Sequence, residues 1–422
     1  MIHTHQIAIV GAGTAGITVA AQLRKKDSNL DIVIIDPAST HYYQPAWTLV
    51  GAGTFDYEKT ARPMADLIPK GVQWIKEYVT SFQPESNTIK LRNDASIKYD
   101  YLVVCPGIQI DLDGIEGLKE TMGKNNVCSN YVDSNYTWEV LQKFKGGNAL
   151  FTQPATPIKC GGAPQKIMYL ADDYFQKQKI KDKTNVVFAT PGSVIFGVAD
   201  FAKTLMEVVD RKNINLKFFH KLVKIDGPNK LAYYEITIPD DSEKSVEYNH
   251  IEQVNVREIT PKSIVIPFDM LHLAPPQSAP DFIKNSPLSY QEGAKKGWLN
   301  VDQATLQHQQ YSNIYGLGDC AALPTAKTGA AVRKQAPVVV QQILNSLKNT
   351  SVDLTYKGYS SCPLVTGYGK MVLAEFGYNN VRMSDPIISK FIDTSKEHYS
   401  MWLLKKYGLP FLYWQLMLKG RI

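Results

Sequence analysis

The chain has 422 residues, of which 44% are hydrophobic and 20% charged, a composition typical of a globular protein with two or three domains. These numbers exclude disordered, collagen-like and small disulfide-rich proteins. The 46 basic and 40 acidic residues leave a net charge of +6, which is too dilute to indicate a nucleic-acid partner. Five cysteines on so long a chain favour a reducing compartment, where thiols are either buried or used in redox chemistry.

We expect neither a targeting segment nor a membrane-spanning helix. A strand-like run at 6–10 begins almost at once, which leaves no room for a signal or transit peptide. The sequence has no stretch of about 18 consecutive apolar residues, the length that a spanning helix needs. It also has no ligand spacing that predicts a metal site.

The first predicted unit is a strand at 6–10, a glycine-rich turn at 11–16, a helix at 17–25 and a strand at 31–36. Apolar residues recur with helical spacing at 17–25. The last segment is apolar throughout its interior, as a buried parallel strand is. This order predicts a βαβ unit of a dinucleotide-binding domain.

The turn carries the pattern Gly-x-Gly-x-x-Gly at Gly11, Gly13 and Gly16, and Asp36 follows twenty residues later. The first glycine permits a tight turn, the second lets a pyrophosphate approach the backbone, and the third lets helix and strand pack closely. The helix N-terminus faces the phosphates, and the carboxylate accepts from ribose hydroxyls. The alternative is an α/β turn with incidental glycines. The pattern does not distinguish FAD from NAD.

A second βαβ-like stretch has a strand at 185–189, a helix at 198–212 and a strand at 215–219. The turn at 189–197 reads Ala-Thr-Pro-Gly-Ser-Val-Ile-Phe-Gly, which breaks the glycine pattern, and no acidic residue ends the next strand. We therefore expect a Rossmann-like fold that does not bind a nicotinamide nucleotide. This disfavours an NADH dehydrogenase or a pyridine-nucleotide disulfide reductase. Residues 239–250 are expected to form a polar loop or hairpin tip.

The late strand 313–319 ends in Gly318-Asp319, and a helix is predicted at about 329–347. This segment resembles the second flavin motif of flavoproteins with two dinucleotide-binding domains. The resemblance implies that FAD binds here, with the aspartate near its ribityl chain and pyrophosphate and the helix N-terminus near the flavin ring. The alternative is that Asp319 is only a turn residue. The candidate FAD-binding residues are Gly11, Gly13, Thr14, Ala15, Gly16, Asp36, Gly107, Gly318, Asp319 and Lys327.

The five cysteines form no Cys-x-x-Cys pair. Cys105 ends a predicted buried strand and Cys320 follows Asp319, so both are expected to pack in the core. Cys160 lies in a glycine- and proline-rich loop with flanking lysines, just before a helix predicted at 165–177, and both features lower a thiol pKa. Cys362 is predicted to lie in a loop at 359–369. On spacing alone, a structural role is favoured for each of the two loop cysteines.

The segments 41–53, 157–169, 359–367 and 409–414 resemble the sulfide:quinone oxidoreductases of the type related to the mitochondrial enzyme. With the two flavin motifs, the resemblance covers essentially the whole chain. It implies that Cys160 and Cys362 are the redox pair beside the flavin. It leaves Cys128 open as an accessory catalytic or a structural residue.

The resemblance also implies a reaction. The two redox cysteines are bridged directly or through an additional sulfur, and hydrosulfide attacks the bridge by thiol–disulfide exchange. Cys362 keeps the sulfur as a persulfide, Cys160 leaves as a thiolate, and two electrons pass through FAD to a membrane quinone. The persulfide sulfur passes to glutathione, coenzyme A, sulfite or further sulfide. Lys159 and Lys166 help to hold anions.

The C-terminal stretch is expected to contact a membrane without spanning it. Residues 409–418 are apolar nearly all round, with Pro410 early in a predicted helix, and residues 390–422 contain six basic and two acidic residues. Apolar aromatics beside lysines suit an interfacial anchor on anionic lipid, whereas docking on the protein's own core is the alternative. The candidate quinone-binding residues are Phe391, Phe411, Tyr413 and Trp414.

We therefore predict an α/β protein with two Rossmann-like dinucleotide-binding domains and a C-terminal amphipathic membrane-contact region. The expected divisions are FAD-binding residues 1–115 and 300–350, a second domain at 116–299 and a C-terminal region at 351–422. The predicted location is peripheral, on the cytoplasmic or matrix-equivalent face of a membrane. Alternatives are a type II NADH:quinone oxidoreductase and a sulfur-binding flavoprotein sensor. The sulfur acceptor, the quinone and a homo-oligomeric state stay open.

Overall fold

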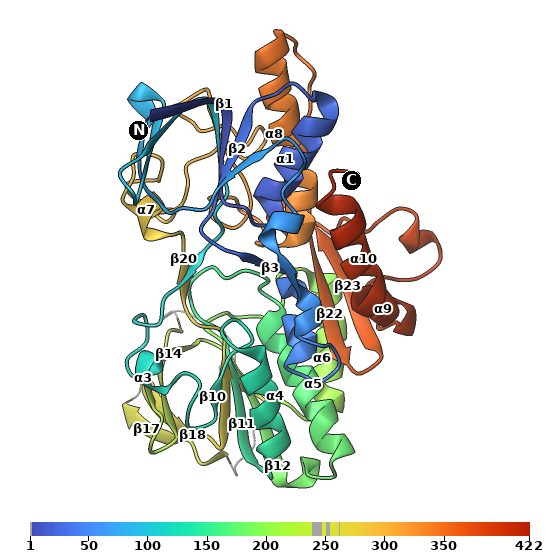
Figure 1. Cartoon of the computed structure of the whole chain (residues 1–422). Helices are drawn as coiled ribbons and strands as arrows, with labels where there is room; N and C mark the ends of the chain where they lie inside the picture. Colours follow the sequence, from blue (N-terminus) through green and yellow to red (C-terminus); the bar gives the residue numbers. More distant parts are fainter. Residues whose placement is uncertain (1, 239–246, 250–253, 261) are drawn as a thin grey trace.

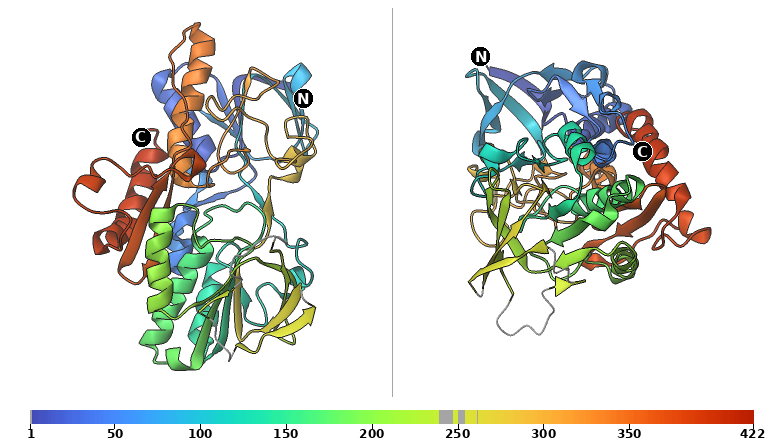
Figure 2. Two further views of the ribbon diagram at one scale, coloured as in Figure 1. Left: turned by 180° about the vertical axis from the view of Figure 1, so that it is seen from behind. Right: turned by 90° about the horizontal axis from the view of Figure 1, so that it is seen from below.

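The computed structural model describes every residue of the chain except 1, 239–246, 250–253 and 261. Two α/β lobes lie end to end, and the C-terminal segment lies against one side of their junction (Figure 1). The views from behind and from below in Figure 2 show the same arrangement. The N-terminal and C-terminal parts of the chain therefore meet beside the region where the two lobes join.

The first lobe is built on a seven-stranded sheet with the order β5-β2-β1-β8-β7-β6, and β21 also pairs with β8. Its centre is parallel, because β1 pairs in parallel with β2 and β8, and β21 does so with β8. Residues 7–10 and 32–35 are buried, as their continuous apolar sequence predicts. The elements are β1 (Ile2–Val10), α1 (Thr14–Lys26), β2 (Ile32–Ile35), β3 (Thr40–Tyr42), α2 (Trp47–Val50), β4 (Ala61–Pro63), β5 (Gln73–Ile75), β6 (Val79–Gln83), β7 (Thr88–Leu91), β8 (Ser96–Val104), α7 (Asp281–Lys284), β21 (Ile314–Gly316) and α8 (Gly329–Lys348).

Two short antiparallel strands carry the chain between the lobes, β9 (Gln109–Ile110) on the way out and β20 (Gln277–Ser278) on the way back. After β20, Ile283, Leu288 and Leu299 pack in the core of the first lobe. Residues 281–299 thus lie with the first lobe, although we expected them in the second domain. The reason is that this stretch is mostly irregular, so its sequence shows no periodicity that would reveal its partner.

The second lobe contains a six-stranded sheet with the order β10-β19-β11-β12-β13-β16 and a four-stranded antiparallel sheet, β14-β15-β18-β17. The predicted middle strand–helix–strand unit is present as β12, α6 and β13. Of the expected polar loop at 239–250, residues 239–246 and 250 lie outside the described residues, and Glu247–Tyr248 forms β16. The elements are α3 (Leu118–Thr121), β10 (Val127–Cys128), α4 (Ser134–Lys143), β11 (Gly147–Thr152), α5 (Ala163–Lys177), β12 (Thr184–Ala189), α6 (Ala199–Arg211), β13 (Asn215–Lys217), β14 (His220–Asp226), β15 (Leu231–Ile236), β16 (Glu247–Tyr248), β17 (Arg257–Thr260), β18 (Ser263–Pro267) and β19 (Met270–Leu273).

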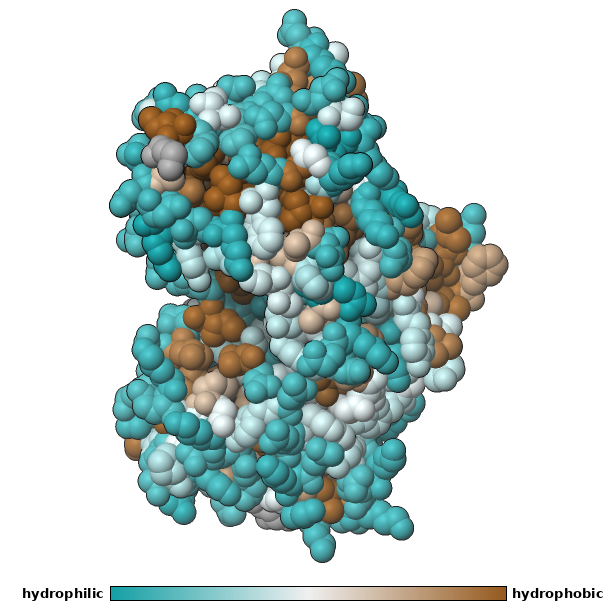
Figure 3. Space-filling view, in the orientation of Figure 1, coloured by the Kyte–Doolittle hydropathy of each residue, from teal (hydrophilic) through white to brown (hydrophobic). Residues whose placement is uncertain are grey.

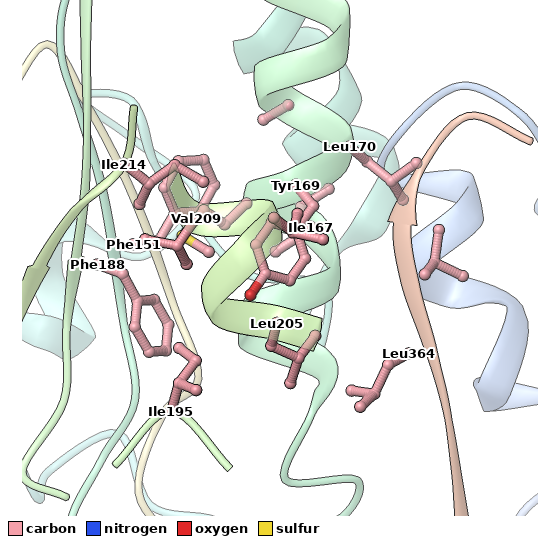
Figure 4. Packing of buried hydrophobic residues seen from close by; sticks show 14 of the residues in the cluster. Phe151, Ile167, Tyr169, Leu170, Phe188, Ile195, Leu205, Val209, Ile214 and Leu364 are labelled. Atoms are coloured by element: carbon pink, nitrogen blue, oxygen red, sulfur yellow. The ribbon is translucent and has the colours of Figure 1, made fainter. Parts of the chain in front are cut away.

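The C-terminal hairpin of β22 (Ser360–Gly367) and β23 (Lys370–Phe376) packs on α5. Figure 4 shows Leu364 of β22 beside the core that Ile167 and Leu170 of α5 share with Leu205 of α6. Burial of these side chains fixes the hairpin to the second lobe. This is how a cysteine of the C-terminal region comes to lie beside the start of α5.

Cys362 lies in strand β22, so the predicted loop at this position is wrong. The prediction rested on Pro363 and the nearby glycines, which usually interrupt a strand. In a hairpin of only two strands, each strand has a free edge, and a proline that cannot donate a ladder hydrogen bond is tolerated there.

The C-terminal helix begins at Tyr399 rather than near residue 409, and it runs to Met417 as α9 (Tyr399–Leu403), a π-helical turn (Leu404–Gly408), α10 (Leu409–Leu412) and a second π-helical turn (Tyr413–Met417). Pro410 therefore lies inside a helical run, where the wider turns change the hydrogen-bond pattern around it. In the part of the chain that the structure describes, no helix has the length and apolar character needed to traverse a lipid bilayer.

Candidate functional site

The predicted dinucleotide loop joins β1 to α1. A Cβ atom at Gly11, whose φ is +104°, would lie 2.6 Å from the Cys105 carbonyl oxygen, and one at Gly16 would lie 1.9 Å from the Gly11 carbonyl oxygen. The chain itself therefore requires glycine at these two positions. At Gly13, by contrast, a Cβ atom would meet nothing within 4 Å. This open side is where a pyrophosphate can approach the backbone.

Asp36 follows β2 and lies directly beside this loop. Its carboxylate accepts hydrogen bonds from the backbone N–H groups of Ala12, at 2.7 Å, and Ala38, at 2.8 Å. Burial raises the pKa of Asp36, and the two hydrogen bonds act in the opposite direction. The acidic residue thus anchors the glycine loop and stands where the ribose of a dinucleotide is expected.

The second predicted flavin motif, at Gly318 and Asp319, lies beside the glycine loop at 11–16. Gly318 lies next to Ala15, since a Cβ atom on the glycine would be 3.5 Å from the alanine Cβ, and its N–H donates to Gln335 of α8 at 2.9 Å. Lys327 donates to the Asp319 carbonyl oxygen at 2.6 Å, and burial lowers the lysine pKa to about 8. A pocket opens here, lined by Gly318, Ala321, Leu323, Thr325, Ala326, Lys327, Thr328, Ala331 and Gln335. The residues present therefore fit FAD.

Cys160 and Cys362 lie side by side, with 3.9 Å between their sulfur atoms, although 202 positions separate them in the chain. Cys160 precedes α5 and Cys362 belongs to β22. Gly162 allows this approach, because a Cβ atom there would lie 2.6 Å from the Cys362 sulfur. The Cys160 N–H donates to the carbonyl oxygen of Lys327 at 2.8 Å, which ties the pair to the second flavin motif.

The cation nearest to Cys160 is Lys166, whose Nζ donates to the Cys160 sulfur at 3.0 Å. Hydrogen bonding from the Cys362 thiol and the charges of Lys166 and Lys405 hold the pKa of Cys160 well below its usual range, against the effect of burial. Burial by itself lowers the pKa of Lys166, but the two sulfur groups raise it overall. These pKa directions and the hydrogen bond from Lys166 favour Cys160 as the thiolate of the pair and Cys362 as the thiol.

Lys405 of the C-terminal helix is a second buried cation at this site. Its Nζ donates to the Pro45 carbonyl oxygen at 2.8 Å. Burial and the charge of Lys166 lower the pKa of Lys405 to about 7, while the two cysteines act to raise it. The sequence does not show that this lysine lies near the cysteines, since its position depends on how the C-terminal helix packs.

Tyr131 was not singled out from the sequence, yet it supports the redox loop. Its hydroxyl donates to the carbonyl oxygens of Lys159, at 3.0 Å, and Cys160, at 3.2 Å. Cys160 has a φ of +52°, a left-handed conformation that costs energy for any residue with a side chain. A buried tyrosine that holds this turn leaves no recognisable pattern in one sequence.

The other three cysteines are fully or almost fully buried. Burial raises the pKa of Cys128 and of Cys320 to about 12, and it raises that of Cys105 as well. Cys128 belongs to β10 and is paired with His272 of β19. Thiols that stay protonated at neutral pH are poor nucleophiles, so these positions favour packing roles.

The turn at 189–197 lacks the glycine pattern and lies against the C-terminal region, beside an open pocket lined by Phe196, Gly197, Val198, Pro324, Thr325, Ala326, Phe376, Gly377 and Asn380. Ile195 is buried in the core, and the space beside Gly197 is taken by Asn380, 3.0 Å from the position of an added Cβ. Arg382 donates to Asp200 in the first turn of α6 at 3.1 Å. Asp200, in the first turn of α6, thus places a negative charge where a pyrophosphate would bind, and its partner is a residue of the C-terminal region.

The four candidate quinone residues are not brought together. Tyr413 is buried and Trp414 half-buried, both facing the first lobe next to Tyr43. Phe391 and Phe411 are 82% and 60% exposed. The inward-facing pair holds the C-terminal helix to the protein, whereas the outward-facing pair is available for contact with another surface.

Comparison with known proteins agrees with this geometry. Residues 5–143 match a family described as pyridine nucleotide-disulphide oxidoreductase. The mitochondrial sulfide:quinone oxidoreductase of Mus musculus is 40% identical over 418 residues, which cover 99% of this chain and 87% of the relative. That of Dictyostelium discoideum is 42% identical over 421 residues, covering 99% and 86%. The chain belongs to the sulfide:quinone oxidoreductase family.

The fold agrees as well. The crystal structure of the sulfide:quinone oxidoreductase from Aquifex aeolicus covers 97% of this chain, and this chain covers 91% of it, with a TM-score of 0.75 and 19% identity. Sulfide:quinone oxidoreductases are FAD-dependent flavoproteins, which fits the glycine loop and the second motif described above. The family, the α/β fold and the cofactor expected from the sequence are therefore confirmed.

Proposed function

We propose that this sulfide:quinone oxidoreductase oxidises hydrosulfide at Cys160 and Cys362 and passes two electrons through FAD to a membrane quinone. The observation that carries the proposal is the pairing of these cysteines 3.9 Å apart, with Lys166 on one of them and the second flavin motif beside it. A pair so arranged can close into a disulfide after a small movement, because an S–S bond is about 2 Å long.

The cycle starts from the bridged cysteines. Hydrosulfide attacks the sulfur of Cys362, the bridge breaks, and Cys160 leaves as a thiolate next to the Lys166 ammonium. A nucleophilic acceptor then takes the outer sulfur of the Cys362 persulfide and leaves a second thiolate. Re-forming the bridge from the two thiolates releases two electrons. Bound FAD supplies the two-electron acceptor for this oxidation and the donor for the quinone.

The sulfur acceptor in this proposal is a small thiol or sulfite, such as glutathione, coenzyme A or sulfite itself. The cations at the site support an anionic substrate. Lys159 lies 5.6 Å from the centre of the Trp47 ring, and burial lowers its pKa. Lys166 and Lys405 give the cysteine pair a positive environment that attracts hydrosulfide and stabilises thiolates.

In the same proposal, Thr14, Ala15 and Gly107 complete the FAD site. Thr14 begins α1, so its N–H and that of Ala15 have no partner within the helix and are available to phosphate oxygens. Gly107 follows β8 with a φ of +82°, and nothing lies within 4 Å of the position of an added Cβ. A ring or ribityl chain can therefore pass close to this backbone.

The membrane-contact surface is the exposed apolar part of the C-terminal region. Figure 3 shows apolar side chains gathered on the flank formed by this region. The exposed apolar residues there are Ile387, Phe391, Tyr399, Leu403, Tyr407 and Phe411. They lie among Lys390, Lys396 and Lys406, which suits anionic lipid on the cytoplasmic or matrix-equivalent face. Phe391 and Phe411 would then stand where a quinone enters from the lipid.

Replacing Phe391 and Phe411 by serine is expected to weaken binding to anionic vesicles by at least about a hundredfold. Burial of each phenyl ring in lipid contributes about 1.5–3 kcal/mol, and the substitution removes two of them. Flotation of the holoenzyme with vesicles of phosphatidylcholine and phosphatidylserine measures the effect.

The matched control is Val194→Ser, which removes an apolar side chain that is 57% exposed on the second lobe. The control is expected to float like the wild type. Undiminished binding of the double phenylalanine variant would refute the proposed contact surface.

The function itself is tested by adding sulfide or NADH to the anaerobic enzyme while the flavin absorbance is followed. We expect sulfide to bleach the flavin and a quinone analogue to restore it, while NADH leaves it oxidised because the turn at 189–197 lacks the glycine pattern that binds a pyrophosphate. Bleaching by NADH would support a type II NADH:quinone oxidoreductase. Bleaching by sulfide without quinone turnover would support a sulfur-binding sensor.

A further inference from the structure

Tyr413 of the C-terminal helix takes part in a closed ring of hydrogen bonds with the dinucleotide loop. Its hydroxyl lies 2.5 Å from Nε2 of His41 and 2.8 Å from the hydroxyl of Thr14. The other ring nitrogen of His41, Nδ1, lies 3.2 Å from the carbonyl oxygen of Ala12. Ala12 and Thr14 belong to the glycine loop 11–16, so the ring begins and ends on the FAD-binding segment.

The direction of each hydrogen bond follows from the neutral imidazole. Burial lowers the pKa of His41 to about 4, so one ring nitrogen donates and the other accepts at neutral pH. A carbonyl oxygen can only accept, so Nδ1–H donates to Ala12. Nε2 therefore accepts from Tyr413, and the Tyr413 oxygen accepts from Thr14. This order leaves every polar atom of the buried ring with a partner.

The residues that follow the C-terminal helix also contact the first lobe, at helix α1. Gly420 approaches the backbone of α1 so closely that an added Cβ atom would lie 2.7 Å from the Gln22 nitrogen. The Gln22 side chain donates to the Ile422 carbonyl oxygen at 3.1 Å. The ring of Tyr413 also packs on Tyr43, with 4.7 Å between the ring centres.

The C-terminal helix therefore has two faces with different partners. One face carries Tyr413 and lies on the FAD-binding loop, while the other exposes Tyr407 and Phe411, which are 62% and 60% accessible. The two faces belong to one continuous helical run, from Tyr399 to Met417. A constraint on the outer face is thus transmitted to the position of Tyr413.

We propose that Tyr413 is a positioning residue through which docking of the C-terminal helix on a lipid surface strengthens retention of FAD. In the docked helix, loss of the Tyr413 hydroxyl would leave Nε2 of buried His41 and the half-buried Thr14 hydroxyl without this partner, so the hydroxyl favours the present arrangement of the loop. Since such coupling is reciprocal, FAD in the loop also holds the helix in place. The part of this inference that concerns the lipid surface rests on the membrane contact proposed above.

This coupling also affects how truncations are interpreted. Removing residues 386–422 would delete the outer apolar face and the inner contact at Tyr413 in one step. Loss of vesicle binding by such a protein would then be accompanied by loss of FAD. Point substitutions on a single face separate the two effects.

The first test compares Tyr413→Phe with Tyr407→Phe, which removes the same hydroxyl from the exposed face of the same helix. We expect the FAD dissociation constant, measured from the fluorescence of released FAD, to rise about tenfold in Tyr413→Phe and to stay unchanged in Tyr407→Phe. We also expect the C-terminal helix of Tyr413→Phe to be cut faster by protease. An unaltered dissociation constant for Tyr413→Phe would overturn the proposal.

The second test adds vesicles of phosphatidylcholine and phosphatidylserine to the holoenzyme. The rate of FAD release should fall severalfold in the wild type and remain unchanged in Tyr413→Phe, although both proteins float with the vesicles. Slowed release in both proteins would exclude Tyr413 as the link. If the wild type does not float, the membrane contact fails while the first test still stands, and neither test requires sulfide turnover.

Discussion

Replacing Cys160 or Cys362 by serine is expected to lower the rate of sulfide-dependent quinone reduction by at least about a thousandfold. A serine cannot form the bridge that hydrosulfide attacks, so the whole cysteine route is lost rather than weakened. Steady-state reduction of a quinone analogue by sulfide measures the effect. Both variants should retain FAD, because neither side chain contributes to the glycine loop or to Asp36.

The two serine variants should differ in the flavin spectrum. Cys160 is the favoured thiolate of the pair, so the Cys362→Ser protein keeps a thiolate beside the flavin site. We therefore expect this variant to keep the long-wavelength charge-transfer absorbance between the thiolate and the flavin. The Cys160→Ser protein should lack this absorbance, and its presence there would show that the roles are reversed. Cys128→Ala is the matched control and is expected to retain activity, because Cys128 packs in the core. Loss of turnover in that variant would instead give Cys128 an accessory role.

The C-terminal region contacts both the turn that lacks the glycine pattern and the cysteine pair. Asn380 lies beside Gly197 of the turn, Arg382 pairs with Asp200 of α6, and β22 of the same region brings Cys362 to Cys160. One region thus borders the degenerate nicotinamide turn and completes the redox pair, so the second lobe keeps its dinucleotide-binding architecture while it serves another chemistry.

The parts of the fold that were predicted from the sequence are those with local causes. The glycine loop, the strand that precedes Asp36 and the helix that begins at Gly329 each depend on residues within about twenty positions of one another. Hydrophobic periodicity and glycine spacing report such local structure directly. The same reasoning gave α6 to within one residue at each end.

Features that depend on distant packing could not be predicted in this way. The 202 positions between Cys160 and Cys362 carry no pattern that pairs them, and only the resemblance to a family joined them. Tyr413 was assigned to the quinone because the stretch 409–418 is apolar on every side, so its sequence does not show which face turns inward. The π-helical turns shift the phase of the helix further.

Replacing Lys166 by methionine is expected to raise the pH at which Cys160 becomes a thiolate by about 1–3 units, the usual effect of an opposite charge at this distance. Methionine keeps an unbranched side chain of similar length but has no charge. In the wild type, the Cys160 pKa lies well below its usual range, so the thiolate persists as the pH falls through neutrality. In Lys166→Met whose Cys160–Cys362 bridge has been opened by sulfide, the long-wavelength absorbance should disappear at a higher pH during acid titration than in the wild type treated in the same way.

The rate of sulfide oxidation should follow the same direction. A thiol with a higher pKa is a poorer leaving group when hydrosulfide attacks the bridge, so the turnover of Lys166→Met should fall most at acid pH and recover partly as the pH rises. Lys166→Arg restores a cation at this position and should move the titration back toward the wild type. A merely structural lysine would lower activity equally at every pH and leave the absorbance titration in place. That outcome would remove Lys166 from the chemistry and leave Lys405, the other buried cation that lowers the Cys160 pKa, as the next candidate.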